Sequence, residues 1–336
     1  MSRLHIRQAG RTIAVGADES VLDAALKARI RYPFGCRAGN CGACKSRLLD
    51  GRIEHLPHSR FALSPEEEAR GLFLACRART RGDGRIAWLD LDEKIVHPRR
   101  DLTCRVESID RPTDDIVILA LKIEAGGPFS FAAGQYAQLR FADLPPRDFS
   151  FAGRPDEDGL RFHIRLRPDG TASGYLRERI RVGERVQVAG PDGQAFLRGQ
   201  HDGPIVAAAG GTGLGPMLSI VETALARGWP HPVTLAVGAR SPEAHYLLEH
   251  LHRLEERHDN LRLLLAVDEA AAGPFQHGRL PDILRPSGTA FAGAAVYCAG
   301  PPAMVEQVAA LARADGVGDE DIHADPFTAA VDDETA

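Results

Sequence analysis

The nine residues from 36 to 44 read Cys36-Arg-Ala-Gly-Asn-Cys41-Gly-Ala-Cys44, and a fourth cysteine follows at Cys76. The spacing is C-x4-C-x2-C, followed by 31 residues and the last cysteine. One class of [2Fe–2S] cluster takes its four thiolate ligands at this spacing. We therefore expect these four cysteines to hold such a cluster.

The residues between the cysteines suit a loop wrapped around a cluster. Gly35, Gly39 and Gly42 can adopt positive φ and bring backbone N–H groups close to sulfur, which stabilises a charged cluster. A structural zinc site is the alternative, but zinc usually takes its ligands from paired C-x2–4-C motifs. One of the four cysteines stands alone here, which favours the cluster.

Residues 1–92 resemble a plant-type ferredoxin domain, because Tyr32-Pro-Phe34 precedes the ligand loop as in many relatives. The resemblance implies a β-grasp-like fold. We expect strands at 3–8, 11–15 and 45–49, and Ser20 with Asp23 predicts a helix start. Ser64-Pro-Glu-Glu67 predicts the start of a second, short helix that ends near Gly71 and leads to Cys76.

Composition and charge narrow the class of protein. The chain has 336 residues, of which 44% are hydrophobic and 26% charged, as in ordinary globular proteins. The N-terminus lacks the apolar core of a signal peptide, and no apolar run approaches the roughly 18 residues that span a membrane. We expect a cytoplasmic protein without a membrane partner, in a compartment where thiols stay reduced.

The charge is unevenly distributed. Residues 1–92 hold 16 Lys and Arg against 11 Asp and Glu, whereas the remainder holds 25 against 35. The ligands have basic neighbours: Arg37, Lys45, Arg47, Arg77, Arg79 and Arg81. This surplus is either an ordinary solvated surface or a device that steers an acidic partner protein. Nucleic acid is not an expected partner, because most of the chain is acidic.

The pattern of apolar residues changes twice along the chain and predicts a multidomain α+β and α/β protein. After a linker at 93–98, alternating apolar positions within 99–200 predict a small antiparallel β-barrel. From Pro204 onward, strand–helix alternation within 201–336 predicts a doubly wound parallel sheet, with helices including Met217–Arg227 and Pro242–Arg257.

The barrel carries a motif that resembles R-x-[YF]-[ST] of the ferredoxin–NADP⁺ reductase superfamily, at Arg147-Asp-Phe149-Ser150. An arginine can pair with a flavin phosphate, and an aromatic ring can stack on the flavin. The resemblance implies an FAD site with these further residues: His163, Arg165, Gly170 and Ser173. Ser173 is expected to cap a helix at the pyrophosphate, and His163 to be packed rather than to act as a base.

The third region carries a glycine-rich turn between a predicted strand and a helix, as dinucleotide phosphate binding requires. It reads Gly210-Gly211-Thr212-Gly213-Leu-Gly-Pro216 and resembles the G-G-T-G-x-x-P form of the same superfamily. Arg240 follows the second strand and could accept the 2′-phosphate of NADPH, yet similar reductases carry an arginine there and use NADH. NADH is therefore the favoured donor, with NADPH as the alternative.

Near the C-terminus, Tyr297-Cys-Ala-Gly300-Pro301-Pro-Ala-Met resembles the C-G-P-P-x-M motif that lies beside the nicotinamide in the family. Here Ala299 occupies the family's cysteine position. Side chains alternate along a strand, so Cys298 should point away from the nicotinamide. The segment ending at Phe327 resembles one whose aromatic residue approaches the flavin, with packing alone as the alternative role.

The order of ferredoxin, FAD and NAD domains resembles the reductase component of multicomponent bacterial oxygenases, such as those of aromatic hydrocarbon catabolism. The resemblance implies an oxidoreductase that passes electrons from NAD(P)H through FAD and the cluster to a separate oxygenase or its ferredoxin. The chemistry would be carried by the cofactors. The alternatives are a reductase for another acceptor, such as a deoxysugar dehydrase, a diaphorase with a vestigial cluster, and a non-enzymatic zinc-stabilised binding module.

Overall fold

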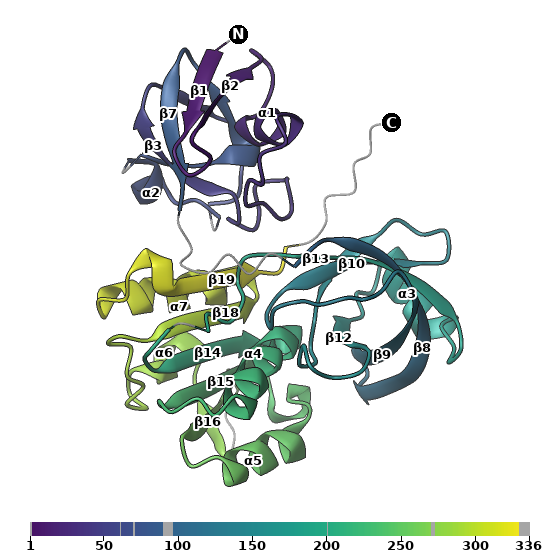
Figure 1. The fold of residues 1–336 in the computed structure, drawn as a ribbon. Coiled ribbons are helices and arrows are strands. Elements are labelled where there is room, and N and C mark those ends of the chain that lie inside the picture. The colour runs from purple at the N-terminus through teal and green to yellow at the C-terminus, as the bar shows by residue number, and fades with distance from the viewer. Residues whose placement is uncertain are drawn as a thin grey trace. The chain divides into compact units, whose positions relative to one another are not determined.

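The computed structural model describes residues 2–60, 62–69, 71–89, 97–199, 201–269 and 273–328. The chain divides into two compact units, Met1–Lys94 and Ile95–Ala336 (Figure 1). Positions 93–96 of the predicted linker lie outside the described residues. Among the helices of the described part, none combines the length and apolar character needed to cross a bilayer.

The first unit is built on a mixed five-stranded sheet. Its order is β2 (Arg11–Val15), β1 (Ser2–Ile6), β7 (Gly84–Trp88), β3 (Lys45–Asp50) and β5 (Leu72–Leu74). In the described residues, β1 and β7 are the only parallel neighbours in this sheet, and its other neighbouring strands are antiparallel. A second, two-stranded sheet joins β4 (Ile53–His55) to β6 (Ala78–Thr80). This is the β-grasp-like arrangement predicted from the sequence.

Two helix starts in this unit follow their capping signals. The helix α1 (Val21–Lys27) has Ser20 as its N-cap, and the Ser20 hydroxyl accepts a hydrogen bond from the Asp23 N–H. The helix α2 (Pro65–Ala69) begins after Ser64, whose hydroxyl accepts from the Glu67 N–H, while Glu67 accepts from the Ser64 N–H. The chain then runs through β5 into the short 3-10 turn η1 (Ala75–Arg77), which carries Cys76.

The second unit begins with a nearly closed antiparallel barrel. Its six strands are β8 (Arg100–Thr113), β9 (Ile116–Ala125), β10 (Tyr136–Phe141), β11 (Arg147–Ser150), β12 (Leu160–Arg165) and β13 (Arg185–Asp192). They follow the order β11-β10-β13-β8-β9-β12, and a bridge between Phe151 and Phe162 joins the two ends. The helix α3 (Thr171–Glu178) follows β12. Cys104 is fully buried in the barrel core.

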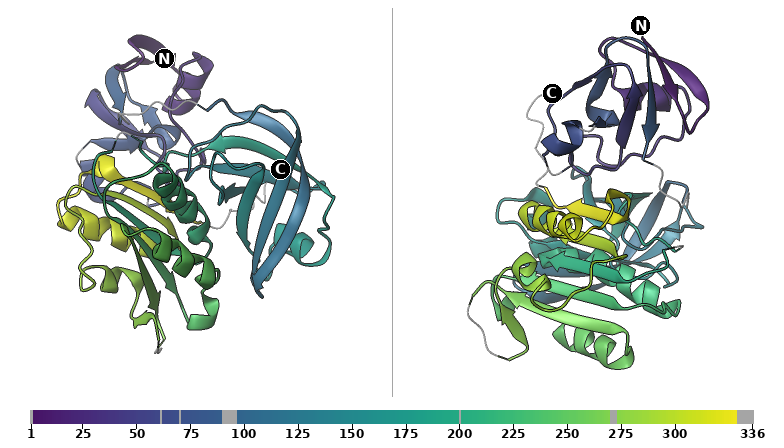
Figure 2. Two further views of the ribbon diagram at one scale, coloured as in Figure 1. Left: turned by 60° about the horizontal axis from the view of Figure 1, so that its bottom comes forward. Right: turned by 90° about the vertical axis from the view of Figure 1, so that its left-hand side faces the viewer.

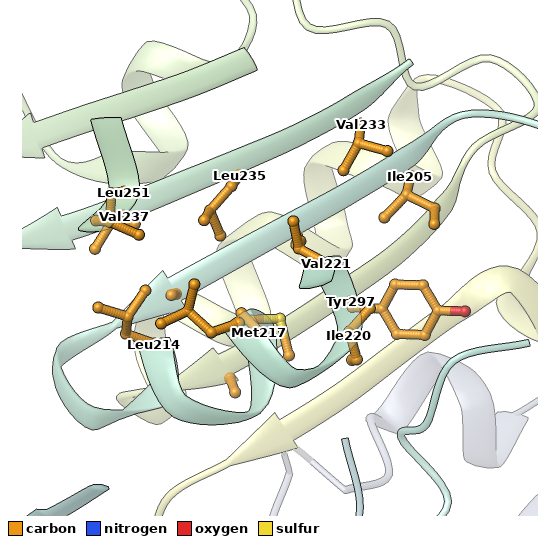
Figure 3. Packing of buried hydrophobic residues seen from close by; sticks show 14 of the residues in the cluster. Ile205, Leu214, Met217, Ile220, Val221, Val233, Leu235, Val237, Leu251 and Tyr297 are labelled. Atoms are coloured by element: carbon orange, nitrogen blue, oxygen red, sulfur yellow. The ribbon is translucent and has the colours of Figure 1, made fainter. Parts of the chain in front are cut away.

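The rest of this unit is a six-stranded parallel sheet. Its order is β17 (Phe275–His277), β16 (Leu261–Val267), β15 (Val233–Ala239), β14 (Ile205–Gly210), β18 (Ala295–Gly300) and β19 (Ile322–Pro326). Apolar residues pack α4 (Leu214–Ala226) and α5 (Leu248–Arg257) on one face (Figure 3). The helices α6 (Leu280–Leu284) and α7 (Pro302–Ala314) cover the other (Figure 2). The doubly wound prediction is confirmed.

Three features of this sheet differ from the sequence prediction. The expected helix Pro242–Arg257 is broken into the 3-10 turn η3 (Pro242–Ala244) and α5, because Leu247 adopts a left-handed φ of 61°. The helix α4 starts three residues earlier than expected, directly after the 3-10 turn η2 (Gly211–Gly213). The edge strand β17, the helix α6 and the 3-10 turn η4 (Asp319–Asp321) were not predicted.

Candidate functional site

The four predicted ligand cysteines come together in the first unit as two pairs. The Cys36 N–H donates to the sulfur of Cys41 at 3.3 Å, and the Cys76 N–H donates to the sulfur of Cys44 at 3.4 Å. All four are free thiols. Nowhere in the described residues do three His, Cys, Asp or Glu side chains meet around one point. Two pairs of thiols match a cluster that takes two thiolates on each iron.

Each pair shares a hydrogen bond between its thiols, and this sharing separates their pKa values. The bond from Cys41 lowers the pKa of Cys36 to about 5, and the same bond raises the pKa of Cys41. In the second pair, the bond lowers the pKa of Cys76 and raises that of Cys44. In each pair one thiol is thus made more acidic and the other less acidic, and a bound cation would favour the thiolate form of both. The donor set thus fits iron.

The conformation of the loop explains which residues it needs. Arg37, Gly39 and Gly42 have positive φ, at 57°, 78° and 72°. The prediction of positive φ was wrong for Gly35, because Arg37 makes the left-handed turn instead. A Cβ at Gly39 would lie 2.7 Å from the Arg77 Cγ, so only glycine fits between the loop and that side chain. The turn also brings the Asn40 N–H to 3.3 Å from the Cys36 sulfur.

Several of the basic residues near the ligands have partners within the unit. Lys45 lies 2.6 Å from Glu67, whose side chain is only 5% exposed. Arg37 lies 2.6 Å from Asp23, and the Arg77 Nε donates to the Pro57 carbonyl at 2.8 Å. Lys45 and Arg37 are thus each paired with a carboxylate, while the surplus of basic residues over the whole unit stays as counted from the sequence. The structure therefore weakens the prediction that Lys45 steers a partner protein, since this lysine is held in a mostly buried ion pair.

The R-x-F-S motif occupies the edge strand β11 of the barrel. Arg147 and Phe149 lie half-buried on it, and the Phe149 ring meets the Phe141 ring edge-on at 6.3 Å. The Ser150 hydroxyl donates to the carboxylate of Asp325 on β19 at 3.3 Å. The motif therefore faces the last strand of the parallel sheet, 175 residues away in the chain. Asp325 was not singled out in the sequence, where only Phe327 was taken from this segment.

The turn after β12 differs in detail from the prediction. The helix α3 has Gly170 as its N-cap, without a side-chain capping bond. Ser173 therefore lies in the first turn of the helix and does not cap it, and its hydroxyl accepts from the Arg167 N–H at 2.9 Å. A Cβ at Gly170 would lie 2.9 Å from that hydroxyl oxygen. Gly170 and Ser173 thus shape the turn that presents the helix N-terminus.

His163 is a packed residue, as the sequence suggested. Its Nδ1 lies 3.0 Å from the hydroxyl of Tyr246, and burial lowers its pKa to about 3, so the ring stays neutral. A Cβ at Gly215 on α4 would lie 3.3 Å from the His163 ring, which shows how closely barrel and parallel sheet approach each other. Arg165 pairs with Asp115 at 2.7 Å, and its guanidinium reaches toward Gly211. The contact with Tyr246 had no signal in the sequence.

The glycine-rich turn and the C-terminal motif touch through their backbones. A Cβ at Gly213 would lie 2.1 Å from the Ala299 carbonyl oxygen. Gly300 has a φ of 137°, and a Cβ there would lie 2.6 Å from the Gly210 carbonyl oxygen. A Cβ at Gly210 would lie 2.6 Å from the Cδ of Pro301. These residues therefore hold two loops together at the carboxyl ends of β14 and β18, where parallel sheets bind ligands.

The remaining residues of this edge are arranged as follows. Thr212 is buried in η2 and Pro216 is buried at the start of α4, whereas Arg240 is exposed directly after β15. The Phe327 N–H donates to the Gly300 carbonyl at 2.8 Å, and its ring packs partly buried against the apolar residues around α4. The strand ends, the helix N-terminus and the segment after β19 thus converge on the two loops.

The alternation predicted for β18 is confirmed. Ala299 packs among the residues around α4, whereas Cys298 packs among those of the α6 and α7 face. The Cys298 sulfur lies 3.9 Å from the Val305 carbonyl, and burial raises the pKa of its thiol to about 12. Cys298 is therefore an inert core thiol, and Ala299 occupies the opposite side of the strand.

Three family descriptions match consecutive parts of the chain. A 2Fe-2S iron-sulfur cluster binding domain matches residues 4–81, an oxidoreductase FAD-binding domain matches 103–196, and an oxidoreductase NAD-binding domain matches 208–310. The matches follow the order predicted from the motifs, and they name the cofactor of each region. The zinc-stabilised binding module is therefore not supported.

Whole-chain relatives agree with these matches. The reductase component of the naphthalene 1,2-dioxygenase system of Pseudomonas putida is 33% identical over 330 residues, which cover 96% of this chain and 98% of the relative. The reductase component of propane 2-monooxygenase from Gordonia is 34% identical over 324 residues, with 94% and 93% covered. The crystal structure of an Amycolatopsis cytochrome P450 reductase has a TM-score of 0.75 at 31% identity, covering 98% and 99% of the two chains.

The similarity spans both units and includes all three cofactor domains. The chain therefore belongs to the reductase components of oxygenase systems, oxidoreductases that pass electrons from NAD(P)H through FAD and a [2Fe–2S] centre to an oxygenase or its ferredoxin.

Proposed function

We propose that Cys36 and Cys41 ligate one iron of the cluster, and that Cys44 and Cys76 ligate the other. The grouping of the thiols into these pairs supports the assignment. N–H groups of the loop donate to the sulfurs, which lowers the cost of holding negative charge there. Replacing Cys41 with serine should abolish transfer to a one-electron protein acceptor while NAD(P)H still bleaches the flavin. Intact transfer would instead support a diaphorase with a vestigial cluster.

The FAD site is proposed to lie along β11, β12 and the N-terminus of α3. Arg147 would pair with a flavin phosphate, and Phe149 would lie against the ring system. The turn that Gly170 and Ser173 shape would present the first N–H groups of the eight-residue helix α3 to the pyrophosphate. His163 would contribute its backbone and its packing against Tyr246, since its neutral, buried ring is already engaged.

The nucleotide is proposed to bind where the two glycine loops meet. Gly210–Gly213 and Pro216 would form the cradle for its phosphates, with the N-terminus of α4 beneath them. Gly300 and Pro301 would line the nicotinamide side, where Phe327 would cover the flavin before the nucleotide enters. Arg165, which is paired with Asp115, extends its guanidinium toward Gly211 and could donate hydrogen bonds to a phosphate there.

NADH is proposed as the preferred donor. Arg240 is exposed after β15 and could meet a 2′-phosphate, but Glu243 follows three residues later in η3. A hydrogen bond from Ser241 lowers the pKa of Glu243, so this carboxylate stays ionised. It would repel a phosphate and could accept from a free ribose hydroxyl. Glu243→Gln should therefore lower the NADH preference, measured as kcat/KM for NADH divided by kcat/KM for NADPH. An unchanged ratio would remove Glu243 from the argument.

FAD held along β11 and β12 would supply the conversion of a hydride into single electrons, and a cluster held by the four cysteines would supply one-electron transfer. The protein would position these cofactors and control proton transfer. Ser150 and Asp325 face each other at the barrel edge, and the hydroxyl can relay a proton between that carboxylate and a group bound at the motif. Ala299 leaves this edge without the thiol of its relatives.

The acceptor is proposed to be the oxygenase component, or its ferredoxin, of an aromatic-ring dioxygenase. The observation that carries this proposal is the similarity to the naphthalene dioxygenase reductase over nearly the whole of both chains. A second candidate is a cytochrome P450 oxygenase, favoured by the similarity to a P450 reductase over both whole chains. We place the protein in the cytoplasm, because its free thiols must stay reduced for iron to bind.

Purified oxygenase components encoded in the same genome would test the proposal. NADH-dependent reduction of a dioxygenase or its ferredoxin should be faster, per unit of acceptor, than reduction of a P450. The reverse order would favour the second candidate. Reduction of dyes alone, with no transfer to any oxygenase component, would contradict both.

A further inference from the structure

Two buried hydroxyl groups lie directly behind the cluster loop. The Tyr32 and Ser46 hydroxyl oxygens are 2.6 Å apart, and their residues are 3% and 0% exposed. The Ser46 hydroxyl donates to the Cys44 carbonyl at 3.0 Å. Serine has a single hydroxyl hydrogen, so the Tyr32 hydroxyl is the donor to Ser46. The hydrogen bonds therefore run in one direction, from Tyr32 through Ser46 to the backbone of a cluster ligand.

The Cys44 carbonyl is also a junction between the two ligands of one pair. It accepts a second hydrogen bond from the Ala75 N–H at 3.0 Å, and the next N–H along, that of Cys76, donates to the Cys44 sulfur at 3.4 Å. On the other side of the same peptide group, the Lys45 N–H donates to the Gly42 carbonyl at 2.8 Å. The hydroxyl chain thus ends on the peptide that joins the loop turn to the fourth ligand.

The tyrosine is itself held in place. Its ring meets the Trp88 ring edge-on, with centroids 5.1 Å apart and planes at 74°. Ser46 lies in β3, between Phe73 of β5 and Trp88 of β7. The sheet therefore holds both side chains in place, so that the Ser46 hydroxyl stays within hydrogen-bonding distance of the Cys44 carbonyl. Buried hydroxyls cost free energy unless they are paired, and here the pairing ends at the cluster.

We propose that Tyr32 and Ser46 are positioning residues that set the geometry and the reduction potential of the Cys44–Cys76 side of the cluster. Hydrogen bonds in a chain polarise one another, so the Tyr32 bond strengthens the bond from Ser46 to Cys44. Donation to that carbonyl draws electron density from the ligand's peptide, which eases the addition of an electron nearby. The inference rests on the cluster assignment and adds two residues that are not ligands.

The test uses the full-length protein with its cofactors, in Ser46→Ala, Tyr32→Phe and Ser46→Thr variants. Redox titration should give a more negative midpoint potential for the cluster in Ser46→Ala, a smaller shift of the same sign in Tyr32→Phe, and recovery in Ser46→Thr. The electron paramagnetic resonance spectrum of the reduced cluster should change in the same order. Loss of one hydrogen bond of about 1 kcal/mol should release iron to a chelator about fivefold faster.

Tyr175→Phe is the matched control, because its hydroxyl bonds to Glu184 within the barrel, outside the ferredoxin unit. It should leave the cluster potential and spectrum unchanged. Lower thermal stability in Ser46→Ala and Tyr32→Phe with an unaltered potential and spectrum would overturn the inference and leave a purely structural role. A wild-type protein without the visible and paramagnetic signals of a [2Fe–2S] centre would instead contradict the cluster assignment itself.

Discussion

Replacing Gly213 with alanine should separate the two loops that meet at the proposed nucleotide site. The added Cβ would lie 2.1 Å from the Ala299 carbonyl oxygen, 2.5 Å from its carbonyl carbon and 3.0 Å from the Gly300 nitrogen. All three neighbours are backbone atoms, so no side chain can rotate to make room. Ordinary contacts between such atoms begin near roughly 3.5 Å, so the loops must part by about 1 Å.

The size of the effect follows from that displacement. Overpacking of a filled interior costs about 1–3 kcal/mol of stability. A reacting group misplaced by about 1 Å can lose about 100-fold in rate. We therefore expect the rate of flavin reduction by NADH to fall by about 100-fold in Gly213→Ala. The flavin and iron contents should remain at wild-type levels, because neither proposed site includes this contact.

Stopped-flow bleaching of the flavin under anaerobic conditions measures this rate. Gly228→Ala is the matched control at the other end of α4, where φ is 74° and no atom lies within 4 Å of a Cβ. It carries the left-handed strain of about 1–2 kcal/mol without the clash, so its reduction rate should be unchanged. A wild-type rate in Gly213→Ala would refute the argument that the contact between the loops positions the nucleotide.

Four further outcomes are expected. Burial lowers the pKa of His163 from its ordinary 6.5 to about 3, so between these pH values the unfolded state binds a proton that the folded state does not. The free energy of unfolding therefore falls as the pH drops through this range, by up to about 1.4 kcal/mol per pH unit. Urea unfolding of His163→Gln from pH 7 to pH 4 should show a shallower dependence, and an equal slope would contradict this. Ala299→Cys should modestly accelerate single-turnover flavin reduction; an unchanged rate would mean that the missing thiol is unimportant. Lys45→Met removes the cation beside buried Glu67 and should cost about 3 kcal/mol in thermal or urea unfolding, whereas a neutral result would show that the pair is dispensable. Arg37→Glu, in an exposed pair, should slow reduction of the partner protein at low salt only; an equal rate would end the steering hypothesis.

The cysteine spacing, the R-x-F-S motif and the glycine-rich turn predicted the cofactors and the order of the domains, and the pattern of apolar residues with the ferredoxin resemblance predicted the three fold types. Each of these signals is local: a ligand loop, a strand end or a strand–turn–helix unit contains its own requirements within about ten residues. The capping pairs Ser20–Asp23 and Ser64–Glu67 were readable for the same reason, because both partners lie three residues apart.

Other features depend on residues that are distant in the chain. Ser150 meets Asp325 because the barrel packs against the last strand of the parallel sheet, and Gly213 lies against Ala299 because β14 and β18 are neighbours in that sheet. No periodicity or spacing encodes such a meeting, which is decided by how whole elements pack. The same holds for Ser173, whose hydroxyl turns to the Arg167 N–H once Gly170 has taken the cap position.

The ligand loop illustrates both what a local sequence predicts and what depends on tertiary packing. Its sequence by itself predicted a [2Fe–2S] centre held by four thiolates, since the spacing is a property of one short segment plus one cysteine. Only the tertiary structure decided that the thiols pair as Cys36 with Cys41 and Cys44 with Cys76, and that Lys45 is neutralised by Glu67. These contacts depend on β3, β5 and α2 being brought together by the apolar core, and burial of that core is the force that assembles them.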